Sequence, residues 1–424
     1  MADAGLRRLR SIVGGSAGNL VEWYDWYAYS AFTLYFAKVF FPAGDQTAQL
    51  LNAAAVFAVG FFARPFGAWL MGLYADRRGR KSALTLSVAL MCGGSLIIAL
   101  CPGYASIGVA APAILVTARL IQGLSLGGEY GTSATYLSEM AGRQRRGFWS
   151  SFQYVTLISG QLLALALLIL LQATMSEEAL QSWGWRIPFF VGGALAVSVW
   201  WLRRGLEETP SFTAREEKVR ARTWWLFLKH PRETAVVIGL TAGGTLAFYT
   251  YTTYMQKFLA NTAGFSKDQA TQISAAALFL FMLLQPFVGW LSDKVGRRPI
   301  LTAFGVGGVL CTWPILTTLG RTTDPVAAFG LVMAALVIVS GYTAINAVVK
   351  AELFPTEIRV LGVAFPYALA NAVFGGTAEY VALWFKSIGR ESWFFGYVTV
   401  MIGVSLLVYV FMRETKTHSR ILED

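Results

Sequence analysis

Long apolar stretches separated by short polar segments recur along the whole 424-residue chain. A helix that crosses the hydrocarbon core of a bilayer needs about 20 mainly apolar residues. Stretches of that length predict twelve transmembrane helices, at residues 14–40, 50–74, 82–101, 108–138, 148–173, 186–203, 235–260, 269–291, 299–319, 325–351, 362–388 and 392–412. The pattern therefore predicts an all-α integral membrane protein.

Composition supports the bilayer as the solvent of this chain. Hydrophobic residues make up 55% and charged residues only 14%, and the mean hydropathy is +0.53. Such a composition does not suit one soluble core.

The net charge of +11 raises the question of a nucleic-acid partner. If both termini lie on one side, most of the 35 Lys and Arg residues also fall there, including the Arg77–Lys81 cluster and Lys350. Positive residues stay in the cytoplasm during insertion, so we expect both termini to be cytoplasmic in an inner membrane. The charge then indicates orientation and contact with anionic membrane lipid, and no nucleic-acid partner.

One loop motif, Gly-x-x-x-Asp-x-x-Gly-Arg, occurs twice, half a chain length apart. Its residues are Gly72, Asp76, Gly79 and Arg80 and, 217 positions later, Gly289, Asp293, Gly296 and Arg297. Repeats in one membrane orientation predict two six-helix bundles, related by a pseudo-two-fold axis along the membrane normal, that rock about a midplane site. The predicted division is an N-terminal bundle (1–203), a cytoplasmic linker (204–233), a C-terminal bundle (234–412) and a cytoplasmic tail (413–424).

Each type of residue in the motif has a physical role. Glycine allows close backbone approach, the aspartate can face the partly positive N-terminus of a helix, and the basic residues can pair across the bundle interface. The repeated pattern resembles the major facilitator superfamily over essentially the whole chain. That resemblance implies the same fold, with the two loops helping to latch one conformation of a gate.

Ionisable residues within the spans are costly and need partners. Arg64 lies twelve residues before Asp76, hence about 18 Å from the cytoplasmic face at about 1.5 Å per residue, and Arg119 reaches a similar depth. Two guanidinium groups at the midplane suit the two carboxylates of a small organic dianion. The alternative is that Arg64 pairs internally with Glu22, Glu129 or Glu379.

Asp25 is the main candidate for proton coupling. Glu22 precedes it by three residues, so both carboxylates lie on one helical face, and Glu129 is a further candidate. The segment Ala118–Gly127 resembles the Arg-x-x-Gln-Gly segment of the superfamily. Proton-linked members with Tyr-Asp in the first helix pair that Asp with this Arg, which implies an Asp25–Arg119 pair here; the alternative is a static ion pair that fixes helix packing.

Other polar residues within the spans are weaker candidates for the substrate pathway. Gly160-Gln161 resembles the Gly-Gln segment that contacts substrate in related sugar:proton symporters. Interhelical hydrogen bonding explains such residues equally well. The further candidates are Tyr154, Tyr249, Tyr254, Asn346 and Asn371.

A narrower resemblance comes from the segments 18–25, 60–67, 127–136, 151–156 and 184–189. They are similar to the metabolite:proton symporter family of bacteria, which implies inward symport of a small organic anion with protons. A dianion entering with one proton carries one net negative charge, which an interior-negative potential opposes by about 2.3 kcal/mol per 100 mV. Two protons make the step electroneutral, and Glu22 and Asp25 are candidate carriers.

Several alternatives remain open. Within the family, citrate, shikimate, another dicarboxylate or a zwitterionic osmolyte is a possible substrate, and a membrane sensor of a metabolite is the alternative outside transport. Drug antiport is disfavoured because the span 148–173 lacks a Gly-Pro-x-x-Gly-Gly signature. The cysteines lack metal-binding spacing and both histidines lie outside the spans, so we expect no metal, no cofactor and no enzymatic activity. We expect a monomer.

Overall fold

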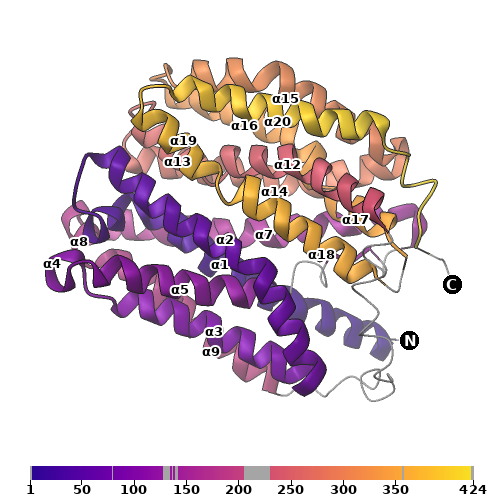
Figure 1. The fold of residues 1–424 in the computed structure, drawn as a ribbon, viewed down its shortest axis with the longest axis horizontal. Coiled ribbons are helices and arrows are strands. Elements are labelled where there is room, and N and C mark those ends of the chain that lie inside the picture. The colour runs from indigo at the N-terminus through magenta and orange to yellow at the C-terminus, as the bar shows by residue number, and fades with distance from the viewer. Residues whose placement is uncertain are drawn as a thin grey trace.

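The computed structural model describes residues 2–78, 80–127, 134–135, 137–138, 142–204, 230–355 and 358–421. Helices run roughly parallel or antiparallel along one long axis, and the two chain ends lie at the same end of the molecule (Figure 1). In the first half the elements are α1 (Ala2–Phe40), α2 (Gln46–Arg78), α3 (Arg80–Leu100), α4 (Tyr104–Ile107), α5 (Ala110–Leu126), η1 (Arg143–Arg145), α7 (Arg146–Thr174), α8 (Glu177–Ser182), η2 (Gly184–Arg186) and α9 (Ile187–Arg204).

The second half repeats this arrangement of long helices. Its elements are α12 (Pro231–Tyr251), α13 (Met255–Asn261), α14 (Lys267–Val295), α15 (Arg297–Leu319), α16 (Pro325–Thr343), α17 (Asn346–Leu353), α18 (Arg359–Ala370), the π-helical turn η4 (Asn371–Gly375), α19 (Ala378–Ser387) and α20 (Glu391–Phe411). Most of the predicted linker, residues 205–229, and the last residues of the tail, 422–424, lie outside the described residues.

The predicted spans correspond to these helices. Among the described residues, eight helical stretches are long and apolar enough to cross a membrane, and Leu86–Leu100 and Ala110–Leu126 are shorter apolar helices. The first and sixth predicted spans lie in α1 and α9. The seventh, tenth and eleventh are each broken, into α12 and α13, into α16 and α17, and into α18, η4 and α19. This is the helical fold of two bundles expected from the sequence.

Different pairs of helices make the contacts within each half and the contacts between the halves. In the first half α2 packs on α5, α1 on α7, and α3 on α9; in the second, α15 and α12 both pack on α20. The halves meet along α7 and α14, and where α2 crosses α18, η4 and α19. The two halves therefore meet along two seams.

Candidate functional site

Arg64 and Arg119 are both buried. They lie on α2 and α5, two helices that pack closely against each other. A Cβ atom added at Gly123 would lie 2.1 Å from the backbone oxygen of Gly60, so only glycine permits this approach. Both guanidinium groups contact Trp26 of α1: the Cζ atoms of Arg64 and Arg119 lie 4.0 and 3.9 Å from its ring centroid. The structure therefore brings the two predicted arginines together around one indole.

Both arginines retain unused hydrogen-bonding capacity among the described residues. The Nε and Nη2 atoms of each have no hydrogen-bond partner there, although buried polar groups normally have one. Their cationic charge is instead held against aromatic faces, including Phe61 for Arg64 and Tyr29 for Arg119. Buried donors with a fixed planar geometry are suited to a carboxylate ligand.

Asp25 lies inside the first half and is joined to Arg119 through Gln122. The Ser95 hydroxyl donates to Oδ1 of Asp25, and Gln122 Nε2 donates to its Oδ2 at 2.5 Å. Arg119 Nη1 in turn donates to Gln122 Oε1 at 2.9 Å. The pairing implied by the family resemblance is thus indirect in this conformation: a neutral amide separates carboxylate and guanidinium. Glu22 is also buried, one turn earlier on α1, and Glu129 lies outside the described residues.

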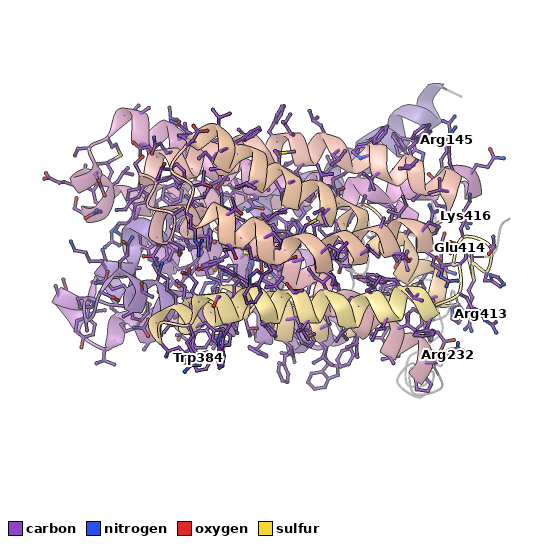
Figure 2. The ribbon with its side chains drawn as sticks, turned by 90° about the horizontal axis from the view of Figure 1, so that it is seen from above. Arg145, Arg232, Trp384, Arg413, Glu414 and Lys416 are labelled. Carbon is purple, nitrogen blue, oxygen red and sulfur yellow. The ribbon has the colours of Figure 1, made fainter. Side chains whose placement is uncertain are left out.

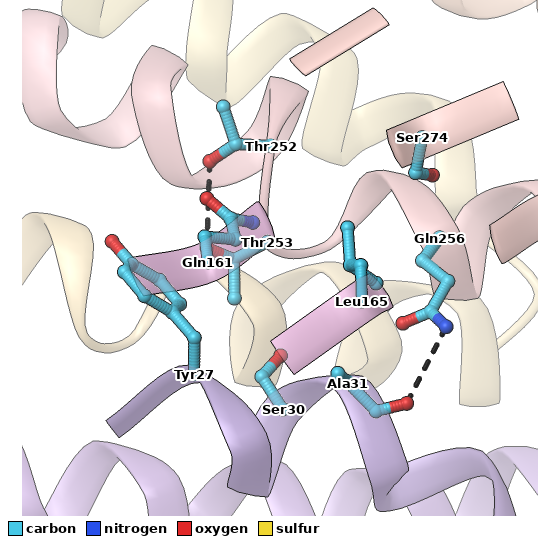
Figure 3. A pocket seen from close by; sticks show the side chains of 9 residues that line it. All are labelled: Tyr27, Ser30, Ala31, Gln161, Leu165, Thr252, Thr253, Gln256 and Ser274. Atoms are coloured by element: carbon cyan, nitrogen blue, oxygen red, sulfur yellow. Dashed lines mark hydrogen bonds between the residues drawn. The ribbon is translucent and has the colours of Figure 1, made fainter. Parts of the chain in front are cut away.

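A small pocket lies between the halves, next to Tyr27 (Figure 3). Gln161 of α7 is in its lining, as are Ser30 of α1 and Gln256 of α13. Among the described residues, the Tyr27 hydroxyl, Gln161 Oε1 and Ser274 Oγ have no hydrogen-bond partner. A pocket between the two halves with unsatisfied polar atoms is suited to a polar ligand or water.

Tyr249 and Asn371 lie near this centre. Tyr249 stacks edge-on against Phe61, the residue that also contacts Arg64. Asn371, at the π-helical turn, accepts a hydrogen bond from Thr245 at 2.5 Å, and a Cβ atom added at Gly375 would touch both Asn371 and Tyr249.

The other predicted pathway residues are more dispersed. Tyr154 is buried against Phe248. Tyr254 packs on Phe394 within the second half. Asn346 accepts a hydrogen bond from Lys350 at 2.8 Å.

Lys350, which the charge distribution assigned to the cytoplasmic side, is fully buried, with Nζ 4.0 Å from the centroid of the Tyr367 ring. Basic residues gather at one end of the helices, where the exposed Arg145, Arg232 and Arg413 and the half-buried Lys416 lie, with Trp384 toward the other end (Figure 2).

One ion pair was not foreseen from the sequence. Lys257 of α13 and Glu379 of α19 are both buried, and Lys257 Nζ lies 2.8 Å from Glu379 Oε2. Lys257 also donates to Ser30 Oγ of α1 at 2.6 Å. The partner of Glu379 in this structure is therefore Lys257, and not Arg64 as in the alternative drawn from the sequence. Lys257 escaped notice because it lies near the end of a span, where lysine normally reaches water.

An exposed ion pair also joins the two halves of the molecule. Lys267, the first residue of α14, donates to Glu177 of α8 at 2.5 Å. The pKa of Glu177 lies below its ordinary value because its carboxylate accepts this hydrogen bond and feels the lysine charge. Such exposed pairs contribute little stability.

The second copy of the repeated loop motif lies on the α7–α14 seam. Asp293 accepts hydrogen bonds from the backbone N–H groups of Gly147 and Phe148, at 2.7 and 2.8 Å, at the N-terminus of α7. Gly289 makes the approach possible, because a Cβ atom there would lie 2.5 Å from the backbone oxygen of Gly147. The aspartate of one half therefore faces a helix N-terminus of the other.

Arg297 fixes this aspartate from within its own half. It donates to Asp293 Oδ1 at 2.8 Å, and its Nη2 lies 3.4 Å from Glu352. Gly296, with φ +105°, makes the turn between α14 and α15, a conformation that favours glycine. In the first copy, Gly79 and the side-chain environment of Gly72, Asp76 and Arg80 lie outside the described residues.

Comparison with known proteins agrees with this architecture. A profile described as "Sugar (and other) transporter" matches residues 12–225 and 214–422. The chain is 56% identical over 408 residues to the alpha-ketoglutarate permease of Escherichia coli K12, covering 96% of this chain and 94% of that protein. It is 33% identical to the citrate-proton symporter of Klebsiella pneumoniae, covering 89% and 85%.

Solved structures support the same fold. The xylose transporter XylE of Escherichia coli, in a partially occluded inward-open conformation, superposes with a TM-score of 0.74 at 20% identity, covering 95% of this chain and 97% of that one. A second structure, of a D-xylose-proton symporter, gives a TM-score of 0.75 at 20% identity, covering 96% and 98%. The sequence resemblance to proton-linked permeases is confirmed, and the chain belongs to the sugar (and other) transporter family of the major facilitator superfamily, as a multi-pass inner-membrane transporter and not an enzyme.

Proposed function

We propose that this protein imports α-ketoglutarate together with protons by alternating access. The observation that carries the proposal is the pair of buried guanidinium groups on Trp26, each with N–H donors that have no hydrogen-bond partner among the described residues. Such groups are expensive to bury without a ligand. A small dicarboxylate supplies both the charge and the paired oxygens that Arg64 and Arg119 require. The 56% identity to an alpha-ketoglutarate permease favours this dicarboxylate.

Asp25 is the proposed carrier of a coupled proton. It is linked to Arg119 by one amide, Gln122, so any movement of Arg119 toward substrate changes the electrostatic environment of the carboxylate. Substrate binding and proton binding are thereby connected through a short chain of side chains. Glu22 and Glu129 remain proposed members of the same coupling group.

The proposed movement is a rocking of residues 1–203 against residues 234–412, in a monomer whose two termini face the cytoplasm. The exposed basic residues at the end that carries the termini support this orientation, and they would contact anionic lipid. Gln161, Tyr154, Tyr249, Tyr254, Asn346 and Asn371 are proposed to line the pathway. Both loop motifs are proposed to latch its cytoplasmic gate.

Uptake of labelled α-ketoglutarate into proteoliposomes tests the function directly. An imposed inward proton gradient should drive accumulation above the external concentration, and dissipating it should leave only equilibration. Citrate, malate and glutamate serve as competitors, since a citrate-proton symporter is also a relative. If α-ketoglutarate neither enters nor competes, the substrate assignment is wrong; if citrate enters instead, the site selects a tricarboxylate.

A further inference from the structure

The Lys257–Glu379 pair is part of the contact between the two halves. Both residues belong to the second half, but Lys257 also donates to Ser30 of the first half at 2.6 Å. The elements that carry the pair, α13 and α19, lie toward the end of the molecule opposite the termini (Figure 1). A charge pair buried within a membrane span is costly and indicates a functional role more often than a structural one. Opening that end must break the bond to Ser30.

The pair borders the pocket between the halves. Ser30, the acceptor of the lysine, lines this pocket together with Gln256, the residue that precedes Lys257 (Figure 3). The Lys257 ammonium is therefore one hydroxyl away from the cavity. Gln161 Oε1 and Ser274 Oγ in the same lining have no hydrogen-bond partner among the described residues. A carboxylate that displaces the Ser30 hydroxyl in this pocket would meet the Lys257 ammonium directly.

The charges around Glu379 determine how its carboxylate responds when a substrate binds Lys257. Among the described residues, the titratable side chains that interact with Glu379 are Lys257, Tyr29 of α1 and Tyr254 beside α13. Only Lys257 among them carries a positive charge. If a substrate carboxylate binds Lys257, Glu379 is left as a buried anion without its counter-charge. Taking up a proton is then much less costly than remaining ionised.

We propose that Lys257 binds one carboxylate of the transported dianion while Arg64 and Arg119 share the other, and that Glu379, released from Lys257, carries a second proton. This inference rests on the proposed function. The balance is complete: a dianion, one proton on Asp25 and one on Glu379 cross together with no net charge. The second proton therefore travels on the opposite half of the protein from the first.

Voltage dependence tests the assignment. Labelled α-ketoglutarate uptake is measured in proteoliposomes with a fixed inward proton gradient and a membrane potential set by potassium and valinomycin. Uptake by the unsubstituted protein should not depend on the potential. Glu379→Gln should move the dianion with one proton and one net negative charge, so an interior-negative potential should lower its equilibrium accumulation about 50-fold per 100 mV.

Two further variants complete the test. Glu391→Gln is the matched control, because Glu391 lies 3.8 Å from Lys386 in the same half, but the pair is partly exposed; its uptake should stay independent of voltage. Lys257→Gln should raise the KM for α-ketoglutarate about ten- to hundredfold, the value of a charge-assisted hydrogen bond. The double variant Lys257→Gln/Glu379→Gln removes both buried charges, so neither is left unpaired. It replaces Glu379→Gln in the voltage measurement if Glu379→Gln fails to fold.

The outcomes separate the two proposals. Voltage-dependent uptake by Glu379→Gln, or by the double variant, together with voltage-independent uptake by the unsubstituted protein, supports a proton on Glu379. If Glu379→Gln responds to voltage as the unsubstituted protein does, Glu379 carries no proton. If the unsubstituted protein does not transport α-ketoglutarate under any gradient, the proposed function has failed instead.

Discussion

Replacing Asp293 by asparagine should loosen the gate at the end of the molecule that carries the termini. The carboxylate accepts two backbone N–H groups of α7 across the seam, at 2.7 and 2.8 Å. Charge-assisted hydrogen bonds contribute about 1.5–3 kcal/mol and neutral ones about 0.5–1.5 kcal/mol. Asparagine keeps one neutral acceptor oxygen and loses the attraction to the helix dipole.

The expected loss is therefore about 2–4 kcal/mol of the closed state relative to the open state. The Arg297 bond is omitted because Arg297 belongs to the same half as Asp293 and moves with it. At about 1.36 kcal/mol per tenfold, the open-to-closed ratio should rise roughly 30- to 900-fold.

Cysteine labelling measures this population. Ser151 is fully buried on α7 and faces Gly289 across the seam, so a cysteine there, in a background without Cys92, Cys101 and Cys311, reacts with a maleimide only when the gate opens. While the open state is the minor one, the labelling rate follows its population and should rise about 30-fold or more in Asp293→Asn.

Asp324→Asn is the matched control for this measurement. Asp324 also caps a helix, accepting from Ala327 N at 2.9 Å, but that helix, α16, belongs to its own half. Labelling should be unchanged in this variant. An unchanged rate in Asp293→Asn, or an equal rise in both variants, would refute the latch.

Three further outcomes are expected. Arg64→Lys should raise the KM for α-ketoglutarate about tenfold or more in uptake assays, because an ammonium group lacks the planar pair of donors; unchanged KM would remove Arg64 from the site. Asp25→Asn should abolish uphill accumulation but retain exchange of internal for external substrate, and continued uphill uptake would exclude Asp25 as a proton carrier. The pKa of Glu177 is lowered by Lys267, so their ion pair is intact at neutral pH and is lost only as the pH falls through that lowered pKa. Because an exposed pair contributes little stability, Glu177→Gln should leave the uptake rate at neutral pH unchanged. A large loss of uptake in this variant would contradict the minor role of the pair.

The spans were predictable from sequence because lipid offers no hydrogen-bond partners. Backbone groups in the bilayer must be satisfied within a helix, so an apolar stretch of sufficient length already specifies the element, as for 269–291 within α14. The breaks after Tyr251, Thr343 and Ala370 were not predicted. Irregular backbone at that depth is tolerated only where protein or a cavity surrounds it, which depends on neighbours far away in the chain.

The candidate site was also predictable from the sequence in one respect and not in another. Sequence position determined the depth of Arg64, Arg119 and Asp25, because helical rise converts residue number into distance along the membrane normal. It could not determine which side chains meet at that depth, since lateral contacts depend on how each helix is rotated and packed. Only the tertiary structure decided that Gln122 stands between Asp25 and Arg119, and that Glu379 pairs with Lys257.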